Sequence, residues 1–176
     1  MDDAGWSNVT DVMDILSMTR SQLDMAVERN DKGRMQVEGD RIRACQGHSF
    51  DGAPVTLDGL EASWIEVRVD QSLWHGTRIA SIAGIAERGI QPGKRTHVHL
   101  APHPESQVGK RSSSDLLLEV SSVRIREHRL RIFQSQNGVM LVRNVPRNCI
   151  VGLKTTHKLA DDVIEDAWRL FDVDDR

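Results

Sequence analysis

A turn-rich segment divides the chain into two stretches with different patterns of apolar residues. Residues 51–63 contain Asp51, Gly52, Pro54 and Gly59, residue types that favour turns and interrupt regular structure. Before this segment the spacing predicts helices and a hairpin, and after it short strand candidates alternate with helical spacing. The sequence therefore predicts an α+β fold in two small units, residues 1–55 and residues 56–176.

The first stretch has the signals of two short helices. One helix is expected to begin at Thr10, as its cap, and to end at Ser17. The next begins with Thr19 and Gln22, the pattern of a capping box, ahead of apolar residues at helical spacing.

A hairpin is expected to follow these helices. Strands are predicted at 35–38 and 41–45, joined at Gly39, because glycine accepts the positive φ of a tight turn. Two helices and a hairpin resemble a winged helix that lacks its first helix.

The second stretch is a mixture of short strands and helices. A helix is expected over 79–90, where Gly89 is placed to end it, and an amphipathic helix is expected around Val163, Ala167 and Leu170. Runs of branched residues predict strands ending at 75 and spanning 97–100, 116–120, 132–133 and 139–142.

Charge is distributed unevenly along the chain. The 23 basic and 26 acidic residues give a net charge of −3, which excludes a uniformly basic nucleic-acid coat and a disordered acidic tail. Residues 108–147, however, hold eight Lys and Arg against three acids. This basic middle either faces a phosphate ligand or is a solvated strand face and loop around Arg124–Arg131.

Neither a membrane anchor nor a disulfide framework is expected. No apolar run approaches the ~18 residues that span a bilayer. The two cysteines, Cys45 and Cys149, have no metal-binding spacing and cannot form a framework of disulfides. A reducing cytoplasm is therefore the expected location.

Two arginines and a small polar segment form the first candidate site. Alternation along the strand puts Arg41 and Arg43 on one face, and Gln46-Gly47-His48-Ser49 then ends the strand. The planar donors of arginine suit a phosphate dianion. An exposed pair on a hairpin is the alternative interpretation.

Histidines provide the second candidate site. His75-Gly76-Thr77 ends a strand before a helix, and alternation places His97 and His99 on the same side of another strand. A third metal ligand is not evident, so we expect no metal. These histidines either form hydrogen bonds to a polar ligand or are structural histidines with satisfied partners.

Five motifs, weak singly, follow one another in a specific order. They are Ile42–Ser49, His75–Thr77, Arg95–Leu100, Val108–Arg111 and Ser135–Val139, which read IRACQGHS, HGT, RTHVHL, VGKR and SQNGV. In this order and at these intervals the chain closely resembles the RNA 2′-phosphotransferase family, which includes the tRNA 2′-phosphotransferases. The resemblance covers about residues 5–152.

The resemblance implies a fold and a reaction. The family has a winged-helix lobe followed by a lobe of the ADP-ribosyltransferase fold that binds NAD⁺, which is consumed. An internal RNA 2′-phosphate attacks the nicotinamide ribose, and transesterification then leaves a 2′-hydroxyl and ADP-ribose 1″,2″-cyclic phosphate. RNA bearing a 2′-phosphate is the implied partner. Because the phosphate is its own nucleophile, the protein supplies positioning and charge stabilisation.

The family pattern also implies site residues. Arg43 and Arg111 match the family's phosphate-binding and transition-state arginines. His48 and Lys110 are assigned to the substrate phosphate with them. The NAD⁺ pocket is expected to contain His75, Gly76, Thr77, Arg95, His97, His99, Ser135, Asn137, Gly138 and Val139.

Two departures from the family pattern lead us to expect reduced turnover. The family's opening Leu-Arg-His segment is not found in this sequence, and Cys45 stands where the family has asparagine. In the family the arginine and histidine of that segment contact the reacting phosphate, and loss of such contacts lowers rates by about 10²–10⁴ for each group, whereas the change at Cys45 is minor. The alternatives are ADP-ribosylation of terminal phosphates on RNA or DNA, or a module that binds NAD⁺ or ADP-ribose without turnover.

Overall fold

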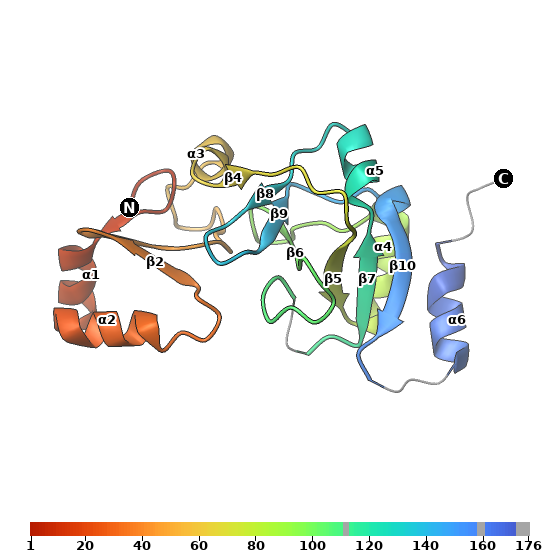
Figure 1. The fold of residues 1–176 in the computed structure, drawn as a ribbon, viewed down its shortest axis with the longest axis horizontal. Helices are drawn as coiled ribbons and strands as arrows, with labels where there is room; N and C mark the ends of the chain where they lie inside the picture. The colour runs from red at the N-terminus through yellow and green to blue at the C-terminus, as the bar shows by residue number, and fades with distance from the viewer. Residues whose placement is uncertain (111–112, 158–160, 172–176) are drawn as a thin grey trace.

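The computed structural model describes residues 1–110, 113–157 and 161–171, and these form an α+β fold as predicted (Figure 1). Three small antiparallel sheets follow one another along the long axis of the molecule. The sheet nearest the N-terminus lies at one end with two helices, and the sheet that contains β7 lies toward the other (Figure 1). The four-stranded sheet lies between them.

The N-terminal unit is a three-stranded sheet, order β1-β3-β2, packed against two helices. Its elements are β1 (Ser7–Asn8), α1 (Val9–Leu16), α2 (Arg20–Glu28), β2 (Met35–Glu38) and β3 (Arg41–Ala44). Val9, Leu23 and Ile42 form its buried core. The predicted capping box of Thr19 and Gln22 is confirmed, as is the hairpin at Gly39, which has a φ of +56°.

The cap predicted for the first helix is wrong by two residues. Asn8, and not Thr10, is the N-cap, and its side chain accepts a hydrogen bond from the Thr10 N–H at 2.7 Å. Asparagine is among the best N-cap residues because its short side chain reaches the unpaired N–H groups of the first turn.

The rest of the chain builds two further sheets, of order β4-β8-β9-β6 and β10-β7-β5. The first half contributes α3 (Leu57–Ala62), β4 (Ile65–Glu66), β5 (Leu73–Thr77), a 3₁₀ turn over Ile79–Ser81, α4 (Ile82–Arg88) and β6 (Val98–Leu100). The second half contributes β7 (Leu116–Val120), α5 (Ser122–Glu127), β8 (Phe133–Gln134), β9 (Met140–Val142), a 3₁₀ turn over Arg147–Cys149, β10 (Ile150–Thr155) and α6 (Asp161–Arg169).

The main core lies around β7, which is paired on both edges. Leu116, Leu118 and Val120 of β7 are fully buried, and α4 contributes Ile82 and Ile85 to the same cluster. α6 lies alongside β10 (Figure 1) and adds Ala167. Gly89 ends α4 with a φ of +72°, as predicted, since only glycine accepts this conformation readily.

Several elements differ from the sequence prediction, and three of them have a clear physical reason. α3 forms inside the segment predicted to be turns, because Thr56 caps it and Leu60 is fully buried. α5 forms where one of the two alternatives placed a solvated strand face and loop, because Ser121 caps it and the buried Ile125 anchors it. The sequence predicts no strand at β10, where a register shift between Ile150 and Gly152 interrupts the alternation.

The structure carries helices and sheets in both predicted units, while the winged-helix and ADP-ribosyltransferase assignments and the boundary at residue 55 stay predictions. Among the described helices, none is long and apolar enough to cross a membrane.

Leu118→Ala tests the importance of β7. Because Leu118 is fully buried, this variant is expected to lose about 2–5 kcal/mol of unfolding free energy in urea titrations. The control Ile65→Ala removes a side chain that is 67% exposed and should change stability by less than about 0.5 kcal/mol. Equal losses for the two variants would contradict this core.

Candidate functional site

A cleft of about 800 Å³ collects residues from six segments of the chain. Basic side chains line it, and the other polar groups come from histidines and amides. Its principal lining residues are Lys32, Arg34, Gly47, His75, Gly76, Lys94, Arg95, His97, His99, Gln107, Gly109, Lys110, Ser113 and Asn137. No Asp or Glu is among the described residues that line this cleft.

His99, on β6, is the centre of the cleft's hydrogen bonding. Nη1 of Arg95 lies 2.9 Å from its Nδ1, and Nδ1 of His75 lies 3.1 Å from its backbone oxygen. Burial lowers the pKa of His99 to about 3, and the positive charge of Arg95 adds to this effect. Since a guanidinium only donates, the neutral His99 ring carries its hydrogen on Nε2.

His97 has a different environment, although alternation predicts that it shares a side with His99. β6 begins at Val98, so His97 precedes the strand. Its ring is only 1% exposed, packs edge-on at 4.9 Å from Trp64 and places Nε2 3.2 Å from Oε1 of Glu61. Burial lowers the pKa of His97 despite this carboxylate. Of the two histidines, His99 is therefore the one available to a ligand.

Glu61 is a buried carboxylate that three cationic or polar side chains hold. Nε of Arg143 lies 2.5 Å from Oε1 and Nη2 of Arg131 lies 2.5 Å from Oε2, beside the contact with His97. Burial opposes ionisation of Glu61, but hydrogen bonds from Arg143 and His97 and the charges of both arginines lower its pKa. Sequence patterns did not single out Glu61, because it lies in the segment predicted to be turns.

The loop before β7 forms another wall of the cleft. Gly109 has a φ of +78°, and a Cβ there would lie 2.6 Å from the carbonyl carbon of Leu100 and 2.7 Å from Cα of Ala101. The absence of a side chain therefore lets this loop lie against the end of β6. Lys110 donates to the backbone oxygen of Pro104. Arg111, predicted to bind phosphate, lies outside the described residues.

Asn137 ties the hairpin between β8 and β9 to the turn after α2. Its Nδ2 donates to the backbone oxygen of Lys32 at 2.9 Å. Gly138 provides the positive φ of this hairpin, at +81°. Ser135 donates to the oxygen of Val139 within the turn, and Val139 is fully buried in a second apolar cluster. Only Asn137 of this motif lines the cleft.

Arg43 lies away from the cleft and is only 5% exposed. Its Nη1 donates to Oγ of Ser63 at 2.6 Å and its Nε to Oε1 of Gln36 at 2.9 Å. The guanidinium also lies 4.5 Å from the ring centroid of Trp6. In this structure Arg43 joins β3 to the segment after α3.

His48 lies outside the described cleft lining as well. Its Nε2 is 3.1 Å from the backbone oxygen of Ala44, and its own backbone oxygen accepts the Thr96 N–H at 2.9 Å. Burial lowers the pKa of its ring. His48 thus holds the start of the Arg95–His99 segment through its backbone.

The structure brings together half of the predicted site residues. The cleft is lined by His75, Gly76, Arg95, His97, His99, Lys110 and Asn137. Thr77 lines an adjoining hollow with His75 and Gly76. Lys32, Arg34 and Lys94 also line the cleft. The sequence analysis did not single out these three residues. The signal that could have found them is a basic residue beside a glycine, because Lys32 and Arg34 flank Gly33 and Lys94 follows Gly93.

Neither cysteine is prepared to act as a nucleophile. Burial raises the pKa of Cys45 and raises that of Cys149 to about 11, so both are thiols at neutral pH. Within the described part of the chain, no cluster of three or more His, Cys, Asp or Glu could hold a metal ion.

Comparison with known proteins decides the family. A sequence model described as "RNA 2'-phosphotransferase, Tpt1 / KptA family" matches residues 1–144. The chain belongs to this RNA 2′-phosphotransferase family. A relative named "Probable RNA 2'-phosphotransferase" from Pseudomonas syringae pv. tomato is 36% identical over 155 residues, which cover 83% of this chain and 79% of the relative.

The similarity extends to an archaeal relative of the same name. The "Probable RNA 2'-phosphotransferase" of Pyrococcus horikoshii is 34% identical over 139 residues, 77% of this chain and 74% of its own length. The part of this chain that matches the family model, residues 1–144, contains all five motifs on which the family resemblance rests.

His99→Gln tests the neutral histidine of the cleft. A histidine with a pKa of about 3 when folded and about 6.5 when unfolded binds its proton more readily in the unfolded chain. Its contribution to stability is therefore present above pH 6.5 and is lost as the pH falls. Between pH 7.5 and 5.5, the wild type should lose about 1 kcal/mol more unfolding free energy than His99→Gln.

Urea unfolding at the two pH values measures this difference. The histidines His48 and His97, which also have lowered pKa values, are retained in both proteins, so their effect cancels. The same pH dependence in the variant and the wild type would show that His99 titrates normally.

Proposed function

We propose that this protein removes an internal 2′-phosphate from RNA with consumption of NAD⁺. The observation that carries the proposal is the composition of the cleft: Lys32, Arg34, Lys94, Arg95 and Lys110 line it, and none of its described lining residues is acidic. Two polyanionic substrates, a dinucleotide and a phosphorylated RNA, need such an excess of positive charge.

The residues present fit NAD⁺. A volume of about 800 Å³ lies in the ~300–1,000 Å³ range of pockets that bury cofactors. Gly47 and Gly76 line the cleft, and backbone without side chains permits close approach to a pyrophosphate. The description of the matching family names RNA as the substrate, which supports an RNA substrate here. The proposal of NAD⁺ is supported by what the sequence resemblance to that family implies.

Positioning and charge are what this chain supplies. When bound, NAD⁺ supplies a ribose carbon whose bond to nicotinamide is broken by attack of the substrate phosphate. Lys110 and Arg95 are positioned to neutralise phosphate oxygens, and the Nε2–H of the neutral His99 is a hydrogen-bond donor in the same cleft. No ionised cysteine is required, which agrees with the raised pKa values of both thiols.

Arg43 has a supporting role in this proposal. Its donors hold Ser63 and Gln36, and a phosphate contact by Arg43 requires release of these partners. We assign the first contacts with the substrate phosphate to Arg95 and Lys110. A phosphate contact by Arg111 is proposed from its match to the family pattern alone. The winged-helix-like unit at 1–55, the ADP-ribosyltransferase-like unit at 56–176 and a cytoplasmic location belong to the same proposal.

A defined oligonucleotide tests the function. The protein is incubated with NAD⁺ and an RNA that carries one internal 2′-phosphate, and the RNA mass and free nicotinamide are measured. We expect loss of the phosphate and release of one nicotinamide per RNA, with none when NAD⁺ is omitted. The same RNA without a 2′-phosphate should release no nicotinamide.

Arg95→Gln should lower kcat/KM by about tenfold or more, since a hydrogen bond to a charged group contributes about 1.5–3 kcal/mol. The control Arg169→Gln changes an exposed arginine of α6 that lines none of the described hollows, and it should retain full activity. Removal of the phosphate without NAD⁺, or no removal in its presence, would contradict the proposed function.

A further inference from the structure

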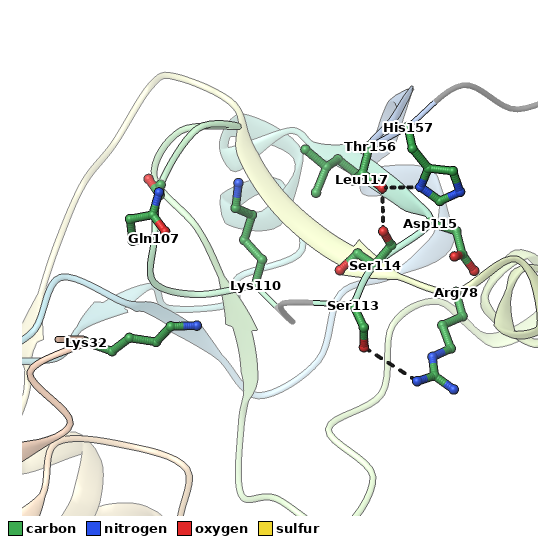
Figure 2. Close-up of a pocket in the computed structure, with 11 residues that line it drawn as sticks. Lys32, Arg78, Gln107, Lys110, Ser113, Ser114, Asp115, Leu117, Thr156 and His157 are labelled. Carbon is green, nitrogen blue, oxygen red and sulfur yellow. Dashed lines mark hydrogen bonds between the residues drawn. The ribbon is translucent and has the colours of Figure 1, made fainter. Parts of the chain in front are cut away.

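A second hollow, of about 870 Å³, adjoins the cleft. Figure 2 shows its walls, which come from the ends of β5, β7 and β10 and from the loop before β7. The hollow shares Lys32, Gln107, Lys110 and Ser113 with the cleft, so the two are continuous. Neither the family pattern nor the proposed function assigns it a ligand.

Three basic side chains give this hollow a positive charge. Lys32, Arg78 and Lys110 come from separate segments (Figure 2), and within the described ranges none of them forms an ion pair with a carboxylate. Asp115 is the one acid in the described lining, and its Oδ2 accepts the N–H of Ile79 at 3.1 Å. An excess of positive charge remains for an anionic ligand.

Of the three basic residues, Arg78 lines this hollow and not the cleft. It follows β5 directly, is exposed and places Nη2 3.5 Å from Oγ of Ser113 (Figure 2). At this distance the contact with the hydroxyl is weak, so the guanidinium can present its paired donors to a phosphate.

The remaining lining is mostly polar and suits a sugar–phosphate group. Ser106 and Ser113 contribute hydroxyls, which can donate to phosphate oxygens. Thr156 is held in place by the backbone oxygen of Ser114 (Figure 2). Within the described lining there is no Phe or Trp, and the ring of His157, whose Nδ1 lies 3.1 Å from Oγ1 of Thr156, is the one aromatic group on which a base could stack.

We propose that this hollow binds the phosphodiester next to the nucleotide whose 2′-phosphate is removed. The proposal rests on the proposed function, because an RNA that places its 2′-phosphate in the cleft must leave it along a neighbouring surface. The hollow is continuous with the cleft through Lys110 and Lys32. Its charge and hydroxyls match a phosphodiester.

In this proposal NAD⁺ extends from the cleft in a different direction from the RNA. A smaller hollow of about 390 Å³ joins the cleft through His75, Gly76 and Gln91 and contains the apolar residues Ile85 and Ile90. It shares no lining residue with the hollow at Arg78. Two substrates can therefore lie in the cleft together and leave it by separate routes.

Neutral backbone analogues test the contact. Short RNAs carry a central 2′-phosphate, and in two of them either the 5′ or the 3′ flanking phosphodiester is replaced by an uncharged methylphosphonate. With saturating NAD⁺, one of the two replacements should lower kcat/KM of the wild type by about tenfold. In Arg78→Gln the unmodified RNA should show a similar loss, and the same replacement should have no further effect.

Two matched variants sharpen the comparison. Arg78→Lys retains the charge and should recover part of the loss, whereas Arg169→Gln on α6 should behave as the wild type. The slope of log kcat/KM against log salt should become shallower by about 0.7 in Arg78→Gln, the value expected when one fewer phosphate of a single strand is neutralised by the protein.

Each result decides the proposal. If Arg78→Gln responds to the methylphosphonate as strongly as the wild type, or if it raises only the KM for NAD⁺, the assignment to RNA is overturned. If the wild type removes no 2′-phosphate at all, the proposed function fails. Fluorescence anisotropy with the same RNAs then tests the hollow separately, and equal sensitivity to the methylphosphonate in wild type and variant overturns it there too.

Discussion

The buried carboxylate of Glu61 is the interaction on which the arrangement of the cleft depends. Its side chain is only 3% exposed, and a charge removed from water in this way is tolerated only when partners surround it. Arg131 precedes β8, Arg143 follows β9 and His97 precedes β6. One carboxylate on α3 therefore holds the ends of three strands of the same sheet.

This anchoring explains why the Arg95–His99 segment has two chemically different histidines. His97 is used to satisfy Glu61, so its ring is part of the core. His99 is two residues further along and faces Arg95, with a pKa lowered to about 3. The positive charge of the cleft thus comes from lysine and arginine side chains, and His99 contributes a neutral donor.

Local signals in the sequence predict much of this structure, while long-range contacts account for what they miss. The capping box at Thr19 and the strand at 116–120 depend on neighbouring residues alone, and both are found. The cleft residues His75, Arg95 and His99 were identified through the order of the family motifs. α3 and Glu61 were not identified, because their placement depends on burial against β8 and β9. Arg43 shows the same limit, since its partners Ser63 and Gln36 are visible only in the fold.

Titration of the imidazole groups with NAD⁺ by nuclear magnetic resonance tests the NAD⁺-binding cleft most directly. His75 and His99 line the cleft, whereas His128 is exposed and hydrogen-bonds to Asn148 elsewhere in the fold. The signals of His75 and His99 should shift together and saturate with NAD⁺, and the signal of His128 should stay in place. Saturation that shifts His128 alone, or no shift of His75 and His99, would contradict the placement of NAD⁺ in this cleft.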